Sequence, residues 1–225
     1  MQTLLAAIVD DNQEQVRVLL KNDLGLATQL VNEARLYKAG IFHWLYIGDT
    51  ALHLAAAGHR DECVRLLLAA GSNPNATTNH RRSSPLHYAA DGYFTGSCFD
   101  PKKQVMTIRT LLNAGGDIEA QDKNGATPLQ RAVRTRSAAA VECLLSAGAS
   151  PNSKNLSGST PFHLAVQNTG RGGSGEKLAK DAQRTIIEIF LAAGVSAGLK
   201  DGKGKSVLDS ARSDSIRELL ISHTK

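Results

Sequence analysis

Short apolar runs with helical spacing come in pairs along most of the chain. In the second run of three successive pairs, apolar residues recur three and four positions apart, which places them on one helix face. These residues are Val64, Leu67 and Leu68, then Ile108, Leu111 and Leu112, then Val141, Leu144 and Leu145. A glycine follows each of these runs and one later run, at Gly71, Gly115, Gly148 and Gly194. Because glycine suits the left-handed conformation that ends many helices, the pattern predicts a repeating series of short helix pairs.

The first run of each pair opens on a shared motif. A Ser or Thr precedes a small residue, often Pro, then an apolar residue and usually His, at residues 50–55, 84–89, 127–132, 160–165 and, more weakly, 206–211. The hydroxyl group can accept a hydrogen bond from a free N–H of the first helical turn. Proline fits the next position because that N–H has no partner within the helix. The motif therefore predicts where each first helix begins.

The spacing of these motifs is regular except for two insertions. Successive starts lie 34, 43, 33 and 46 residues apart, whereas the distance from each helix-ending glycine to the next start is 12 or 13 residues. The extra residues must therefore lie within two repeats, between the first and second helices, at residues 91–103 and 168–181. Such insertions can be functional loops, or length variation that costs little free energy.

The repeat resembles the ankyrin repeat, and the resemblance covers nearly the whole chain. It implies an all-α fold, an ankyrin-repeat solenoid of stacked helix-turn-helix units with β-hairpin fingers and with capping repeats at both ends. We expect one domain over residues 1–225: an N-terminal cap repeat with an extended finger at 1–47, internal repeats at 48–82, 83–124, 125–157 and 158–203, and a C-terminal cap repeat at 204–225. The cap helices are expected at 4–9 and 15–20, and at 206–211 and 215–221.

The most unusual segment is the apolar and aromatic run at residues 41–47, where the other fingers are polar and contain glycine. Its alternation predicts an extended strand with half of its side chains turned inward. The run can be a plug that covers the atypical segment 25–40. It can also expose Trp44 and Tyr46 as a binding anchor, since Trp and Tyr are frequent in binding hot spots.

The chain is basic, with a formal net charge of +5 and a pI near 9.2. Lysine and arginine recur in or beside the finger turns, at Arg81, Arg82, Lys123, Lys154, Lys200, Lys203 and Lys205. Three more arginines, Arg131, Arg134 and Arg136, fall on one first helix. These charges can serve solubility alone, or form a positive groove that attracts acidic partners and speeds encounter. The resemblance implies that fingers and first helices line one concave surface, which would gather these charges.

The resemblance also implies which positions contact a partner, namely the finger before each motif and the end of each first helix. In this sequence they are Trp44, Tyr46, Asp49, His80, Arg81, Asp91, Lys123, Arg134, Lys154, Gln167, Asn168, Lys203 and Lys205. The surface would grade from aromatic at the N-terminal end to basic at the C-terminal end, and suit an acidic protein with an apolar anchor residue. Two residues depart from the family pattern: Arg82 replaces a finger glycine, and Gln130 replaces the histidine of the motif.

Other chemistries are poorly supported. The resemblance implies that His53, His87 and His163 are structural, so we expect no metal site. Cys63 and Cys143 fall at buried positions of the repeat and Cys98 in an insertion, without zinc spacing. Residues 170–177 approach a phosphate-binding loop, but Glu176 stands at the lysine position. We therefore expect no cofactor and no catalytic residues.

The leading hypothesis is a non-enzymatic module for protein–protein interaction. The first alternative is binding of nucleic acid or another polyanion through the basic finger row, and the second is a small-molecule site under the two insertions. We expect the chain to be a monomer. We also expect it in the cytoplasm, because the N-terminal sequence lacks the features of a secretory signal and no apolar run reaches membrane-spanning length.

Overall fold

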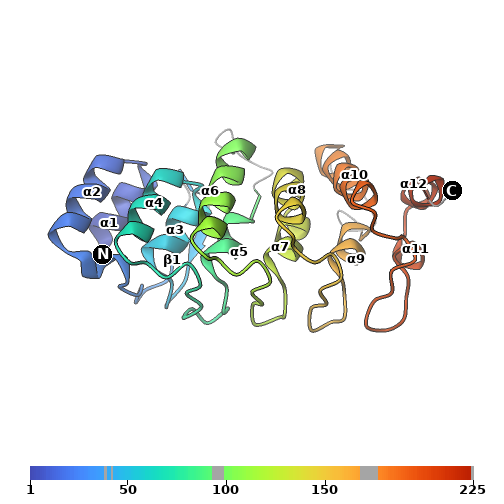
Figure 1. The fold of residues 1–225 in the computed structure, drawn as a ribbon, viewed down its shortest axis with the longest axis horizontal. Helices are drawn as coiled ribbons and strands as arrows, with labels where there is room; N and C mark the ends of the chain where they lie inside the picture. The colour runs from blue at the N-terminus through green and yellow to red at the C-terminus, as the bar shows by residue number, and fades with distance from the viewer. Residues whose placement is uncertain (38–39, 42, 93–98, 168–176, 224–225) are drawn as a thin grey trace.

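The computed structural model describes residues 1–37, 40–41, 43–92, 99–167 and 177–223, and it is an elongated row of helix pairs (Figure 1). The first helices of the pairs are α1 Gln2–Val9, α3 Ala51–Ala57, α5 Pro85–Ala89, α7 Pro128–Arg134, α9 Pro161–Ala165 and α11 Val207–Ser210. The second helices are α2 Gln13–Asn22, α4 Asp61–Ala69, α6 Pro101–Asn113, α8 Ala138–Ser146, α10 Lys177–Ala192 and α12 Asp214–Ser222. A 3-10 helix η1 Leu24–Ala27 and two strands, β1 Arg35–Tyr37 and β2 His43–Leu45, lie between α2 and α3. The chain is thus a mostly helical repeat solenoid.

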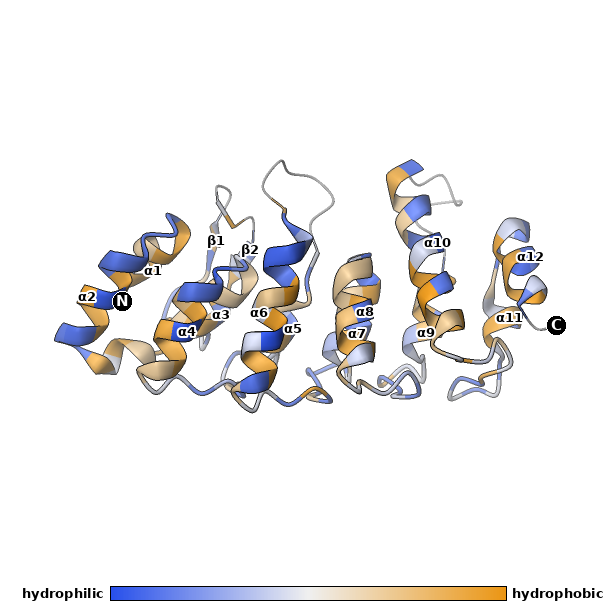
Figure 2. Cartoon of the chain, turned by 45° about the horizontal axis from the view of Figure 1, so that its top comes forward, coloured by the Kyte–Doolittle hydropathy of each residue, from blue (hydrophilic) through white to orange (hydrophobic). Residues whose placement is uncertain are grey.

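The core runs continuously between the layer of first helices and the layer of second helices. The apolar residue of the four clear motifs is fully buried at the start of a first helix: Leu52, Leu86, Leu129 and Phe162 are each 0% exposed. In the weaker fifth motif the buried residue is Val207, one position earlier. The second helices bury one face of their apolar spacing, as in Val64 and Leu67 of α4. Figure 2 shows hydrophobic and hydrophilic stripes along α4, α6 and α10, as expected of helices with one buried face.

The helix ends follow the sequence motifs. The predicted Ser and Thr residues are the N-caps of α3, α5, α7, α9 and α11. Gly71, Gly115, Gly148 and Gly194 all have positive φ, between 75° and 95°, which confirms their left-handed conformation. A side-chain Cβ at any of these four positions would meet nothing within 4 Å, so backbone conformation alone favours glycine.

The two insertions lengthen second helices. Helices α6 and α10 contain 13 and 16 residues, against 9 in both α4 and α8. Part of each predicted inter-helix insertion, residues 101–103 and 177–181, is therefore helical. The remainder includes residues 93–98 and 168–176, which lie outside the described residues, as does Cys98.

The apolar segment before α3 forms a two-stranded antiparallel hairpin. Strand β2 pairs with β1 in a register that places Leu36 opposite Trp44. Ile41 and Leu45 are buried, whereas Trp44 and Ile47 are 47% and 57% exposed. The preceding segment is fixed in place, because the Ser72 hydroxyl donates a hydrogen bond to the Ala27 carbonyl and Val31 exchanges backbone bonds with Gly48 and Asp49. The alternation thus gives the hairpin one covered face and one open face.

The later fingers are tight turns organised by one Asn or Asp each. The side-chain Oδ1 atoms of Asn79, Asp122, Asn155 and Asp201 each accept hydrogen bonds from backbone N–H groups two and four residues later. The fourth residue of the turn has positive φ in every case, and Arg82 takes this conformation (φ 52°) without being glycine. Neighbouring fingers are joined by single backbone hydrogen bonds: Lys123 N–H to Arg81 O, Leu156 N–H to Asn124 O, and Gly202 N–H to Gly158 O.

Candidate interaction surface

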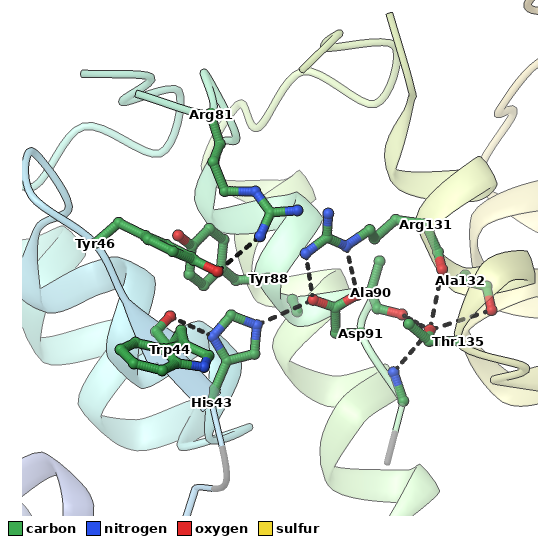
Figure 3. A network of polar contacts seen from close by, with 12 residues as sticks. His43, Trp44, Tyr46, Arg81, Tyr88, Ala90, Asp91, Arg131, Ala132 and Thr135 are labelled. Atoms are coloured by element: carbon green, nitrogen blue, oxygen red, sulfur yellow. Dashed lines mark hydrogen bonds and ion pairs between the residues drawn. The ribbon is translucent and has the colours of Figure 1, made fainter. Parts of the chain in front are cut away.

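An aromatic cluster joins the first two fingers. The rings of Trp44 and Tyr46 are stacked with centroids 6.3 Å apart, and Tyr46 meets the His80 ring edge-on at 5.1 Å. The Arg81 guanidinium lies 5.2 Å from the centre of the Tyr46 ring and donates a 2.8 Å hydrogen bond to its hydroxyl (Figure 3). Four of the residues singled out from the sequence, Trp44, Tyr46, His80 and Arg81, therefore lie together. We call them the aromatic cluster.

Asp49 lies beneath this cluster and is 0% exposed. Its Oδ2 atom accepts hydrogen bonds from the Tyr46 N–H at 2.6 Å and from the Tyr88 hydroxyl at 2.8 Å. The sequence placed Asp49 among the contact residues, but the structure turns its carboxylate into the repeat stack. Asp49 positions Tyr46 and does not present a surface charge.

Asp91 is a second interior carboxylate, at the end of α5 (Figure 3). The Arg131 guanidinium donates two hydrogen bonds to it, from Nε to Oδ1 at 2.7 Å and from Nη2 to Oδ2 at 3.0 Å. His43 Nε2 lies 3.0 Å from Oδ2. Burial acts to raise the pKa of Asp91, but Arg131 and His43 outweigh burial and hold this pKa at about 2. The sequence predicts a contact role for Asp91, but the structure buries its carboxylate, which ties β2, α5 and α7 together.

The motif histidines are structural, as the resemblance implied. His53, His87 and His163 each hold the N-cap hydroxyl through Nδ1, and each reaches a finger carbonyl through Nε2. Burial lowers the pKa of His53 and of His87, which favours the neutral imidazole. In the third internal repeat Gln130 makes equivalent bonds: its Oε1 accepts from Thr127 N–H, and its Nε2 donates to the Ser153 and Ser159 carbonyls.

The basic residues reach the surface farther along the row. Lys123, Arg134, Lys154, Gln167, Lys203 and Lys205 are all exposed, and the Lys154 ammonium donates to the Asp201 carbonyl at 3.3 Å. Arg131 is half-buried and paired with Asp91, so it adds little to the surface charge. Asn168 lies outside the described residues.

Two grooves meet at Gln167. One, of about 170 Å³, is lined by Arg134, Arg136 and Gln183 over an apolar floor of Val133, Leu164 and Ile186. The other, of about 660 Å³, lies between the last two fingers and is lined by Ser157, Ser159, Asp201, Lys203, Lys205, Ser210 and Arg212. The sequence predictions for Arg134, Gln167, Lys203 and Lys205 thus fall on two adjoining hollows.

The fingers also expose an apolar residue that the sequence pattern did not indicate. Leu156 is 80% exposed at a finger tip, in the turn position that Tyr46, His80 and Lys123 occupy in the preceding fingers. The available signal was an apolar residue inside the turn of residues 155–158, in a finger otherwise made of polar residues and glycine. Leu156 supplies an apolar point between the aromatic cluster and the basic end.

The described residues offer no arrangement of three or more His, Cys, Asp or Glu side chains that could hold a metal ion. Cys63 and Cys143 are buried free thiols, as predicted, and burial raises the pKa of Cys63 to about 11. In the same part of the chain, no helix combines the length and the apolar character needed to cross a membrane.

Comparison with known proteins gives two family matches. Residues 101–183 match the model described as ankyrin repeats (3 copies), and residues 47–79 match the single ankyrin repeat model. Among similar proteins are the tyrosine-protein kinase Shark of Drosophila melanogaster, 33% identical over 145 residues (64% of this chain and 13% of the kinase), and the mouse ankyrin repeat and SOCS box protein 6, 30% identical over 92 residues (41% and 20%). The mouse NF-kappa-B inhibitor delta is 37% identical over 92 residues, which are 41% of this chain and 25% of the inhibitor. The matched stretch spans a quarter or less of the length of each of these relatives.

Proposed function

The chain belongs to the ankyrin repeat family, whose repeats generally mediate protein–protein interaction, and we propose that it is a non-enzymatic module that binds a protein partner through its finger tips and first-helix ends. The observation that carries this proposal is the aromatic cluster. Trp44 keeps 47% of its surface exposed while its neighbours Tyr46 and Arg81 are fixed by hydrogen bonds. A large side chain that is already ordered loses little conformational entropy on binding.

The remainder of the proposed surface is graded in polarity. Leu156 offers a second apolar point, and the exposed cations follow toward the C-terminal end at Lys154, Lys203 and Lys205. This order supports a partner with an apolar knob at one end of its contact surface and acidic groups at the other. We extend the proposal to the repeat divisions given from the sequence, and to a cytoplasmic setting in which the buried thiols of Cys63 and Cys143 stay reduced.

Affinity capture from a nuclease-treated cell lysate tests this function. We expect the parent chain to enrich a protein that a Trp44→Ala/Tyr46→Ala variant does not enrich. The matched control is Met106→Ala/Leu178→Ala, because both residues are at least 50% exposed but lie on the second helices α6 and α10. Circular dichroism of all three chains should show the same helix content.

Two outcomes would argue against the proposal. If nuclease treatment removes every captured protein while untreated lysate yields nucleic acid, the basic row is a polyanion site. If the control variant loses the partner as completely as the Trp44/Tyr46 variant, the aromatic cluster is not the anchor.

A further inference from the structure

The groove between the last two fingers gathers more cations than the smaller hollow beside it. Its lining includes three cations, Lys203, Lys205 and Arg212, and one carboxylate, Asp201. Hydrogen bonds from the Lys205 and Lys203 N–H groups lower the pKa of Asp201, so this carboxylate is ionised at neutral pH. The lining therefore carries two net positive charges.

The three cations are available to a ligand. All three are exposed, and within the described ranges none of them forms an ion pair. This sets them apart from Arg131, whose charge is satisfied by Asp91. The cations also come from two elements, since Lys203 and Lys205 lie in the last finger and Arg212 follows α11, so they approach the groove from different sides.

Neutral donors complete the lining. The hydroxyls of Ser157 and Ser210 are engaged with Asn155 Oδ1 and the Ser206 carbonyl. For the Ser159 hydroxyl and the Gln167 side-chain amide, the described part of the chain supplies no partner, and both line the groove. A bound oxyanion would thus meet three cations and two unengaged neutral donors.

We propose that this groove receives a phosphorylated serine or threonine of the protein partner. The inference rests on the proposed function and specifies what one end of the surface recognises. A phosphate monoester carries a charge of about −1.5 to −2 at neutral pH, which matches the two net positive charges of the lining, whereas one carboxylate neutralises only half of them. The phosphate also offers three acceptor oxygens, and an arginine such as Arg212 can bind two of them at once.

The neighbouring groove extends the recognition. Gln167 separates the cationic groove from the hollow that combines Arg134 and Arg136 with Val133, Leu164 and Ile186. A segment crossing Gln167 would place an apolar side chain in this smaller hollow when its phosphate occupies the larger one. The expected motif is therefore a phosphorylated residue close to an apolar residue.

The test uses three fluorescein-labelled nonapeptide pools with degenerate flanks and a fixed central phosphoserine, serine or glutamate. Fluorescence anisotropy with the whole chain should show the phosphoserine pool binding at least about tenfold more tightly than the serine pool, the effect of one charge-assisted hydrogen bond. Lys203→Gln/Arg212→Gln should remove this preference. The matched control Lys21→Gln/Lys180→Gln makes the same change in net charge on α2 and α10, and it should leave the preference intact.

Three results would overturn the inference. They are equal binding of the phosphoserine and serine pools, binding of the glutamate pool as tight as that of the phosphoserine pool, and equal weakening by the control pair. Repeating the lysate capture after phosphatase treatment separates the two proposals. A partner retained after treatment refutes phosphate recognition and leaves the proposed function standing, whereas the absence of any partner in both arms refutes the proposed function.

Discussion

Gln130 shows that the repeat requires a bonding pattern and not a particular side chain. A histidine at this position bonds to the N-cap through one ring nitrogen and to the next finger through the other. The Gln130 amide reproduces both ends of this connection, with an oxygen toward Thr127 and a nitrogen toward two carbonyls. Gln130 departs from the motif in sequence, but the physical requirement at this position is a buried group that both accepts and donates hydrogen bonds.

Replacement of Gln130 should distinguish the contribution of its hydrogen bonds to stability from the contribution of its packing. Gln130→Ala leaves the Thr127 N–H and the Ser153 and Ser159 carbonyls without this partner, so we expect the free energy of unfolding to fall by about 2–4 kcal/mol. Gln130→His should stay within about 1 kcal/mol of the parent. Urea unfolding followed by circular dichroism measures both. Equal losses in the two variants would show that packing, and not hydrogen bonding, fixes this residue.

At the scale of elements, the first finger is the only one among the described residues that contains a paired strand, β2 against β1. Its alternation divides neighbouring residues between two environments, with Leu45 1% exposed and Trp44 47% exposed. Leu45 is buried, as the plug interpretation predicts, whereas Trp44 keeps the exposure that the proposed anchor requires. Leu45 belongs to the core, and Trp44 lies at the surface.

Alanine substitutions along β2 should separate these roles. Leu45→Ala should reduce the free energy of unfolding by about 2–5 kcal/mol, because it leaves a cavity in the core. Trp44→Ala should cost about 1 kcal/mol or less, which is the contribution of its stacking on Tyr46. Thermal unfolding of the two variants gives the comparison. A loss at Trp44 as large as that at Leu45 would mean that Trp44 is part of the core.

The helices and their ends could be predicted because local chemistry sets them. The N-cap hydroxyls and Gly71, Gly115, Gly148 and Gly194 act through backbone groups within a few residues. The roles of Asp49 and Asp91 could not be predicted, because their partners Tyr88 and Arg131 lie 39 and 40 residues away in sequence. A carboxylate beside a motif looks the same in sequence whether it faces a partner protein or a buried arginine. The helical part of the first insertion was missed although Asp100 and Pro101 carry the N-cap and first-turn signals of a helix start.

At the scale of the whole molecule, three buried histidines in the N-terminal half make the stability of the fold depend on pH. Burial lowers the pKa of His53, His59 and His87, and that of His59 falls to about 4. His59 is held through Nε2 to the Ala89 carbonyl of the next repeat, 3.1 Å away. Because the repeats are stabilised by their neighbours, a charge forced into one joint weakens the repeats on both sides.

Stability should therefore fall as the solution is acidified. The unfolded chain binds protons at these histidines below a pH of about 6.5, whereas the folded chain resists protonation. Through His59 alone, acidification from about pH 6.5 to pH 4 should lower the free energy of unfolding by on the order of 3 kcal/mol. Above pH 6.5, His59 should add no further pH dependence. Urea unfolding at a series of pH values measures the slope.

His59→Asn is the control for this titration. Asparagine tolerates the positive φ of 51° at this position and does not titrate. The variant should start from a lower stability at pH 7.5 and lose less of it on acidification. A slope unchanged from that of the parent would assign the acid sensitivity to other groups.

The last two fingers touch at two glycines, and this contact controls the groove beside them. A Cβ on Gly202 would lie 2.9 Å from the Gly158 Cα, and one on Gly158 would lie 3.0 Å from the Gly202 Cα. The absence of side chains at Gly158 and Gly202 therefore sets the separation of the two fingers. A single added methyl group would push the fingers apart and separate Lys203 from Ser159 without removing a charge or a hydrogen-bond donor. The width of this groove thus depends on Gly158 and Gly202, although neither residue contributes a side chain to its lining.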